Sequence, residues 1–159
     1  MEQVTAYGHP LVLVTGGEPL AQRNCTVLLQ ALIEAGFTTQ LETAGAHDIA
    51  PLPDAVSIIM DIKTPSSGEA ERNRWQNIEQ LQANDEVKLV IGDEHDYTWA
   101  KRAIDEHGLT RLNIPILFSP AWQKVEPATL VSWMLRDRLP VRLQLQQHKY
   151  IWGAERTGV

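Results

Sequence analysis

Aliphatic and charged side chains alternate along the β-rich segments of this chain. In residues 56–63, Ile58 and Met60 fall on one face of a strand, because side chains in a strand alternate with a period of two. Asp61 and Lys63 fall on the opposite face. The same split recurs in residues 38–42, 87–91 and 141–148. A parallel sheet covered by helices on both sides would be aliphatic on both faces. The alternation therefore predicts an α/β fold, a partial (incomplete) TIM-like β/α barrel of parallel strands with outer helices and a polar interior.

Strand-like and helical patterns follow one another along the whole chain, which is typical of βα units. The expected strands are Leu11–Thr15, Thr38–Glu42, Val56–Ile62, Val87–Ile91, Ile114–Phe118 and Val141–Gln146. The expected helices are Leu20–Glu34, Arg72–Gln82, Tyr97–His107 and Glu126–Arg138. Gly36 and Gly108 are expected just past helix ends. Because no linker or repeat interrupts the pattern, we predict a single domain over residues 1–159.

Composition excludes several classes of partner. The net charge is −6 with acids and bases interleaved, so no basic stripe is available for nucleic acid. No apolar run approaches the roughly 18 residues of a membrane span, and no signal peptide opens the chain. We therefore expect a cytoplasmic protein with a small-molecule ligand and with neither nucleic acid nor a membrane as partner.

The chain contains a single cysteine, Cys25. One thiol excludes both a disulfide framework and a multi-thiolate metal site built from these residues. Cys25 stands in an apolar helical stretch beside Val27 and Leu28, so we expect it to be a small buried hydrophobe.

Four charged residues on the interior parity cluster near the carboxyl ends of their strands: Glu42, Asp61, Lys63 and Lys88. Charges in such an interior are costly unless they are paired or bound to a ligand, so this clustering indicates a binding site. The alternative is an internal ion-pair network without a ligand.

The first strand runs into the sequence Thr15-Gly16-Gly17-Glu18-Pro19. Two glycines permit a sharp turn that exposes backbone N–H and C=O groups to a ligand, and the Glu18 carboxylate can bind an ammonium group. Pro19 suits the first position of a helix. A plain strand-to-helix turn is the alternative. A phosphate-binding turn is disfavoured because it lacks a P-loop lysine and Glu18 would repel phosphate.

Two further groups of residues are candidates. Asp93-Glu94-His95-Asp96 stands where a helix should start, which favours capping over metal binding, so no metal ligand is predicted. His148 follows Gln144 and Gln146 on the interior parity of the last strand. It is either a ligand-binding residue or a hydrogen-bonded structural histidine.

Several of these segments resemble one enzyme family. Thr15–Pro19 resembles the Gly-Gly-Glu-Pro motif of radical S-adenosylmethionine enzymes, and Glu42-Thr43-Ala44-Gly45 is similar to their Glu-Thr-Asn-Gly segment. The segments 61–68 and 148–153 resemble those of 7-carboxy-7-deazaguanine synthases, and the likeness covers nearly the whole chain. Such enzymes use S-adenosylmethionine, a four-iron four-sulfur cluster and magnesium. They convert 6-carboxytetrahydropterin into 7-carboxy-7-deazaguanine for queuosine and other 7-deazapurines, with release of ammonia.

The resemblance implies roles for particular residues of this chain, although it implies no catalytic residue. The implied cofactor-binding residues are Thr15, Gly16, Gly17, Glu18, Glu42, Asp61 and Lys63. The implied residues for the pterin substrate are Thr15, Gly17, Gln146 and His148. We expect Glu18, Glu42, Asp61 and Lys63 to ring one cavity.

The chain departs from the family in lacking the cysteine triad that precedes the Gly-Gly-Glu-Pro strand. We therefore expect an N-terminally truncated barrel that binds no cluster and is inactive by itself. The alternative is a non-catalytic protein that binds S-adenosylmethionine or pterin on a degenerate fold, so enzymatic activity is left open. Loss of a first strand would leave an open edge and apolar exposure along Leu11–Val14, from which we predict a homodimer.

Overall fold

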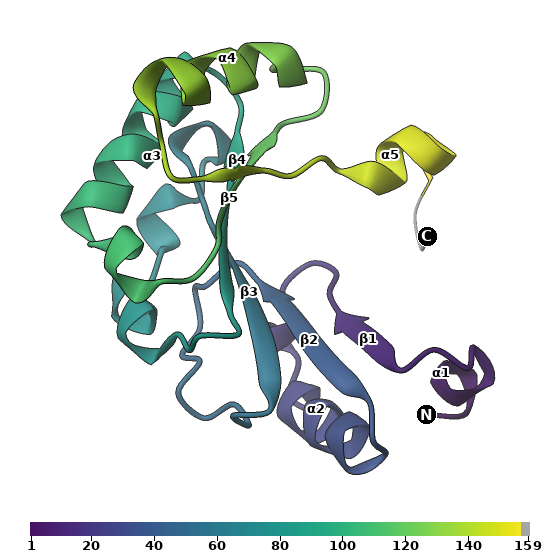
Figure 1. Ribbon diagram of the computed structural model, residues 1–159. Helices are drawn as coiled ribbons and strands as arrows, with labels where there is room; N and C mark the ends of the chain where they lie inside the picture. The colour runs from purple at the N-terminus through teal and green to yellow at the C-terminus, as the bar shows by residue number, and fades with distance from the viewer. Residues whose placement is uncertain (157–159) are drawn as a thin grey trace.

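In the computed structural model, which describes residues 1–156, six parallel strands form one open sheet (Figure 1). The strands are β1 (Leu11–Val14), β2 (Thr38–Thr43), β3 (Val56–Ile62), β4 (Glu86–Ile91), β5 (Ile116–Pro120) and β6 (Arg142–Leu143), in spatial order β1-β2-β3-β4-β5-β6. Strands β1 and β6 are the two edges and do not meet. The predicted α/β fold with an incomplete barrel is therefore confirmed.

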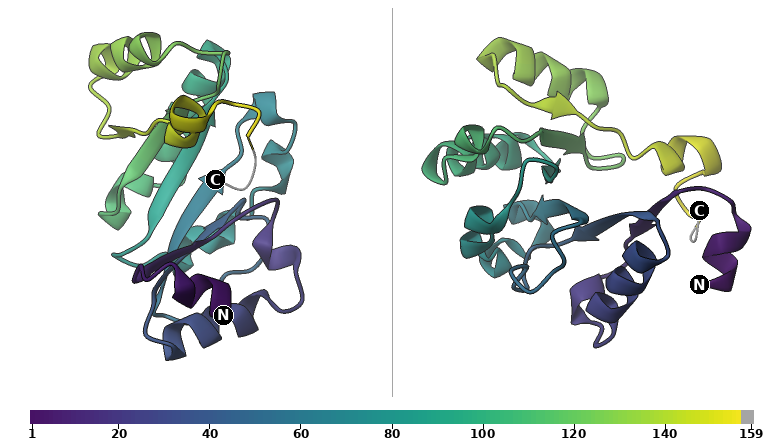
Figure 2. Two further views of the ribbon diagram at one scale, coloured as in Figure 1. Left: turned by 90° about the vertical axis from the view of Figure 1, so that its right-hand side faces the viewer. Right: turned by 60° about the horizontal axis from the view of Figure 1, so that its bottom comes forward.

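The helices lie mainly on one side of this curved sheet. The α-helices are α1 (Glu2–Ala6), α2 (Cys25–Glu34), α3 (Glu94–Glu106), α4 (Pro127–Asp137) and α5 (Gln147–Trp152). Helices α2, α3 and α4 cover the outer face, whereas α1 and α5 lie on the open side, as the two views of Figure 2 show. In the described part of the chain, no helix is both long and apolar enough to cross a membrane.

The outer face of the sheet holds the core. Leu41, Met60, Leu89 and Phe118 are buried there on successive strands, and the strand register sets the Cα atoms of Leu89 and Phe118 opposite each other. The intervening residues of each strand face the interior of the partial barrel, as the period of two requires. The predicted division into an apolar and a polar face is confirmed for β2, β3 and β4.

Helix α2 buries a different stripe from the one expected. Cys25, Leu29 and Leu32 are buried, at the spacing of one helical face, while Val27 and Leu28 are exposed. Cys25 is only 7% exposed. The prediction of a buried cysteine is confirmed, but its buried neighbours are one helical turn further along.

The predicted helix Arg72–Gln82 is wrong. The crossover from β3 to β4 contains three 3₁₀ segments, η2 (Pro65–Ser67), η3 (Ala70–Arg72) and η4 (Trp75–Gln80). Apolar residues recur every third position here, which also suits the three residues per turn of a 3₁₀ helix. In addition, the fully buried Asn77 side chain donates hydrogen bonds to the carbonyls of Gly45 and His47, which fixes the segment against the loop after β2.

Several element boundaries also differ from prediction. The first predicted helix is divided into η1 (Pro19–Ala21) and α2, because Gln22 is extended. Strand β5 begins two residues late, and β6 has only two residues. Helix α3 begins at Glu94. The helix ends are as expected, because Gly36 and Gly108 adopt positive φ angles of 86° and 62°.

Strand β1 is an exposed edge. Leu11 and Leu13 are 42% and 43% exposed, whereas Val12 and Val14 are half-buried. The expected apolar exposure is therefore found on one face of this strand. The predicted homodimer stays a prediction.

Candidate functional site

The four clustered charged residues, Glu42, Asp61, Lys63 and Lys88, meet on the inner face of the sheet. The Lys63 ammonium lies 2.9 Å from an Asp61 carboxylate oxygen, and the Lys88 ammonium lies 3.8 Å from the same oxygen. Lys88 also forms an ion pair with Glu42, whose other carboxylate oxygen lies 3.4 Å from the Thr15 hydroxyl. Because two lysines face two carboxylates, the formal charges of this group balance. The ion-pair network that was the alternative to a site is therefore present.

This network lies at the wall of a cavity of about 640 Å³. The side chains that line it come from β1 to β5 and from the segment after β6, and its polar members are Thr15, Glu42, Asp61, Lys88, Ser119, Gln144, Gln146, Gln147 and His148. A second cavity of about 470 Å³ shares Asp61 and Gln146 with the first and adds Lys63, Ser66 and Lys124. The two cavities adjoin each other at the carboxyl ends of the strands, where they share Asp61, Val90 and Gln146.

Three hydrogen-bond acceptors in this region are buried without a partner among the described residues. They are one carboxylate oxygen of Asp61 and the side-chain oxygens of Gln144 and Gln146. A buried polar group without a partner costs about 1–3 kcal/mol. Three such acceptors around one cavity are what a ligand that donates N–H or O–H groups would satisfy. Gln144 was not predicted as a site residue, although its parity with Gln146 on the last strand could have identified it.

A third, smaller pocket of about 230 Å³ adjoins this region and was missed by the sequence analysis. It shares Gln146 with the larger cavities. Its wall is formed by Trp122 and Tyr150, whose rings pack edge to face with centroids 4.9 Å apart. The Trp122 indole N–H is also buried without a partner in the described chain. An aromatic wall with one free donor suits a flat heterocycle.

The glycine turn after β1 has the geometry that the sequence indicated. Gly16 and Gly17 have φ angles of 103° and 54°, which favour glycine, and no atom lies within 4 Å of a Cβ built on either residue. The backbone of this turn is therefore open to close approach by a ligand.

Glu18 lies apart from the other three predicted ring members. Its carboxylate accepts hydrogen bonds from the Leu20 N–H at 2.9 Å, the Thr43 hydroxyl at 2.9 Å and the Ala44 N–H at 2.7 Å. Thr43 belongs to the outer parity of β2. Glu18 thus fixes the glycine turn to the end of β2, and its contact with a cofactor stays a prediction.

His148 does not lie on a strand as predicted. The extended segment ends at Gln146, and His148 lies exposed in α5 at the margin of the 640 Å³ cavity. The short helix begins there because a Gln147 N–H to Leu145 carbonyl hydrogen bond turns the chain. A role in substrate binding is still open to this residue.

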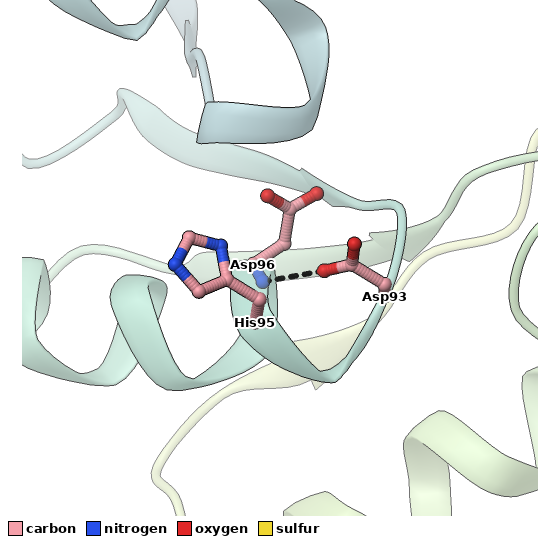
Figure 3. A group of neighbouring side chains, drawn as sticks. All are labelled: Asp93, His95 and Asp96. Atoms are coloured by element: carbon pink, nitrogen blue, oxygen red, sulfur yellow. Dashed lines mark hydrogen bonds between the residues drawn. The ribbon is translucent and has the colours of Figure 1, made fainter.

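The group Asp93, His95 and Asp96 acts as a helix start (Figure 3). The Asp93 carboxylate caps α3 by accepting the Asp96 N–H at 2.8 Å, as predicted. Potential ligand atoms of the three side chains lie within 4.8 Å of one another. However, the Asp96 carboxylate already accepts hydrogen bonds from Thr64, Ser66 and Gly92. The Asp96 carboxylate therefore has hydrogen-bond partners within the chain.

The residues of this chain do not fit an iron–sulfur cluster. Cluster iron is held by several thiolates, and Cys25 is the chain's single cysteine. Burial raises the pKa of the Cys25 thiol, and the nearby charge of Glu18 raises it further. A buried thiol with a raised pKa is a poor metal ligand.

The sequence is similar to several enzymes with one name. A 7-carboxy-7-deazaguanine synthase of Chlorobaculum tepidum is 45% identical over 163 residues, which cover 100% of this chain and 73% of the relative. The enzyme of the same name from Koribacter versatilis is 40% identical over 94% of this chain and 72% of the relative. The enzyme of the same name from Methanospirillum hungatei is 36% identical over 88% of this chain and 58% of the relative. No family model matches the sequence.

Proposed function

The chain belongs to the 7-carboxy-7-deazaguanine synthase family, and from this premise we propose that its polar cavity binds S-adenosylmethionine together with a pterin substrate. One observation carries the proposal: three buried acceptors without partners surround a single cavity. Amino and hydroxyl groups of the two ligands would supply the missing donors. An ion-pair network without a ligand would have no need of these acceptors.

The proposed roles follow from chemistry and position. The open backbone at Gly16 and Gly17 holds the methionyl end of the cofactor. Asp61 and Lys63 receive its ammonium and carboxylate charges. Gln146 and Gln144 form hydrogen bonds with the amide and amine edge of the pterin, because a glutamine side chain both donates and accepts hydrogen bonds. The Trp122 pocket, which opens beside Gln146, accommodates a flat ring.

The family reaction needs more than these residues provide. Reductive cleavage of S-adenosylmethionine is chemistry of the cluster and cofactor, and this chain contains one cysteine. We therefore assign the 159 residues the binding and orientation of the two ligands, and assign them no step that passes through the cluster. No magnesium ligand is assigned either.

Isothermal titration calorimetry with each ligand tests the proposal. We expect the chain to bind both S-adenosylmethionine and 6-carboxytetrahydropterin. Replacement Gln144→Met removes a buried acceptor while it keeps the length of the side chain. It should raise the free energy of unfolding by about 1 kcal/mol and weaken the pterin about tenfold. Gln76→Met, at an exposed glutamine of η4, is the matched control and should change neither quantity.

The proposal would be contradicted if the chain bound neither ligand. It would also be contradicted if Gln144→Met bound the pterin with unchanged affinity. Anaerobic reconstitution with iron and sulfide is the second test. A stoichiometric four-iron cluster on the 159-residue chain would overturn the assignment of binding without turnover. Tight binding of one ligand alone would favour a non-catalytic binding protein.

We also propose that the chain forms a homodimer through the open edge at β1, where Leu11 and Leu13 are exposed. A monomer in light scattering at micromolar concentration would count against this. A cytoplasmic location remains a prediction from the sequence.

A further inference from the structure

Two loops at the carboxyl ends of neighbouring strands line the 470 Å³ cavity. Residues 63–68 follow β3, and Gly92 and Asp93 follow β4. The side chain of Asp96 lies behind both loops in the first turn of α3, where the residue is fully buried.

The Asp96 carboxylate joins the two loops. From the loop after β3 it accepts the Ser66 N–H at 2.9 Å, the Ser66 hydroxyl and the Thr64 hydroxyl at 3.1 Å. From the loop after β4 it accepts the Gly92 N–H at 2.9 Å. Capping of α3 does not require this residue's carboxylate, because Asp93 provides the cap.

The space around Gly92 shows how closely the two loops approach at this contact. A Cβ atom on Gly92 would overlap the Ser66 hydroxyl oxygen and would lie 3.0 Å from a carboxylate oxygen of Asp96. The φ angle of Gly92 does not fall in the range that favours glycine. A side chain at position 92 would therefore displace the Ser66 hydroxyl from its contact with Asp96.

The start of the first loop is fixed from its other side. Asn73 accepts the Lys63 N–H at 2.9 Å and donates to the Lys63 carbonyl at 2.8 Å. The backbone of residues 63–66 is thus held between Asn73 and Asp96. This leaves the Lys63 ammonium directed at Asp61, in the polar region of the site.

We infer that Asp96 is a positioning residue of the ligand site, which holds the loops after β3 and β4 together so that Lys63 is preorganised toward the cavity that these loops line. The effect of Asp96 on ligand binding rests on the proposed function. The joining of the two loops by Asp96 applies also to the ligand-free protein. Preorganisation of this kind matters because small displacements of binding groups are costly.

Two variants remove the contact by different means. Asp96→Asn replaces an acceptor oxygen by a donor that faces other donors, and Gly92→Ala separates the loops. The matched control is Asp85→Asn, which alters an equally buried aspartate. The Asp85 carboxylate accepts the Ile58 and Gln82 N–H groups at 2.7 Å each, away from the cavity.

Hydrogen exchange in the ligand-free protein is the first measurement. Relative to Asp85→Asn at equal global stability, both variants should accelerate exchange of the Ser66 and Gly92 amides by about tenfold or more. Calorimetry with S-adenosylhomocysteine is the second. Both variants should weaken the affinity for S-adenosylhomocysteine by about tenfold or more, whereas Asp85→Asn should leave that affinity within about twofold.

Exchange no faster than in the control would overturn the inference. Faster exchange with unchanged affinity would overturn it too, since the contact would then be structural only. If the unaltered chain binds no S-adenosylhomocysteine but the variants show local acceleration, the proposed function fails while the positioning of the loops by Asp96 stands.

Discussion

On the outer face of the sheet, Leu41 and Leu89 are buried among other apolar side chains, whereas on the inner face Glu42, Asp61 and Lys88 lie around a cavity. Apolar burial on the outer face is the main source of folding stability. The inner face buries charges and unpartnered acceptors, which cost free energy. The difference indicates that one face stabilises the fold, while the other carries groups that are costly to bury, for which we propose a ligand as the partner.

The largest expected effect separates neighbouring residues on opposite faces of β4. Leu89→Ala should lower the free energy of unfolding by about 2–5 kcal/mol, because it leaves a cavity in the core. Val90→Ala, on the half-buried inner face, should cost about 1 kcal/mol or less. Urea denaturation measures both, and equal losses would refute the distinction between the faces.

A second prediction concerns how tightly the outer face is packed. Gly45 has a φ of 69°, and a Cβ atom there would lie 2.9 Å from Cγ of Met60. Gly45→Ala should therefore cost about 2–4 kcal/mol, from backbone strain and overpacking together. Gly68→Ala is the control, since Gly68 has a similar φ of 74° but open space around it. It should cost about 1–2 kcal/mol. If chemical denaturation gave the same loss in the free energy of unfolding for both variants, crowding against Met60 would be excluded as a cause.

On the inner face, a double-mutant cycle with Glu42→Gln and Lys88→Met should reveal coupling. The Lys88 side chain is only 14% exposed, so its ion pair is weakly screened. We expect an interaction free energy of about 1–3 kcal/mol. The exposed pair Glu69 and Arg72 serves as the control and should give about 0.5 kcal/mol or less. Comparable values from denaturation of the two sets would mean that the cavity does not shield its charges.

The smallest expected effect distinguishes two buried aspartates by pH. Burial raises the pKa of Asp96, but hydrogen bonds from Ser66, Gly92 and Thr64 outweigh it and lower the pKa below 3.8. Its contribution to stability is therefore present above pH 3.8 and is lost as the pH falls. Burial raises the pKa of Asp85 above 3.8, so its contribution is present below that pH and is lost as the pH rises.

Urea denaturation of Asp96→Asn and Asp85→Asn between about pH 2 and pH 6 tests this pair, because the contribution of Asp96 is lost below pH 3.8. The stability difference from the unaltered chain should shrink toward acid for Asp96→Asn and toward neutral pH for Asp85→Asn. A change in the same direction for both variants would contradict the assignment.

Patterns within short segments allowed much of the site to be predicted. The inward direction of Glu42, Asp61 and Lys63 follows from parity alone, and Asp93 was identified as a cap from its place before a helix. His148 was misplaced because the strand pattern was extended past Gln146, where the chain turns into α5. The 3₁₀ crossover was missed because apolar residues three apart fit both kinds of helix.

The sequence by itself determined the two faces of the sheet, since the direction of a strand side chain depends only on its position along the strand. Tertiary structure alone decided the partners of Glu18 and Asp96. Glu18 meets Thr43, 25 residues away, and Asp96 meets Ser66, 30 residues away. Such contacts depend on which strands pair and in what register, and a local pattern does not encode them.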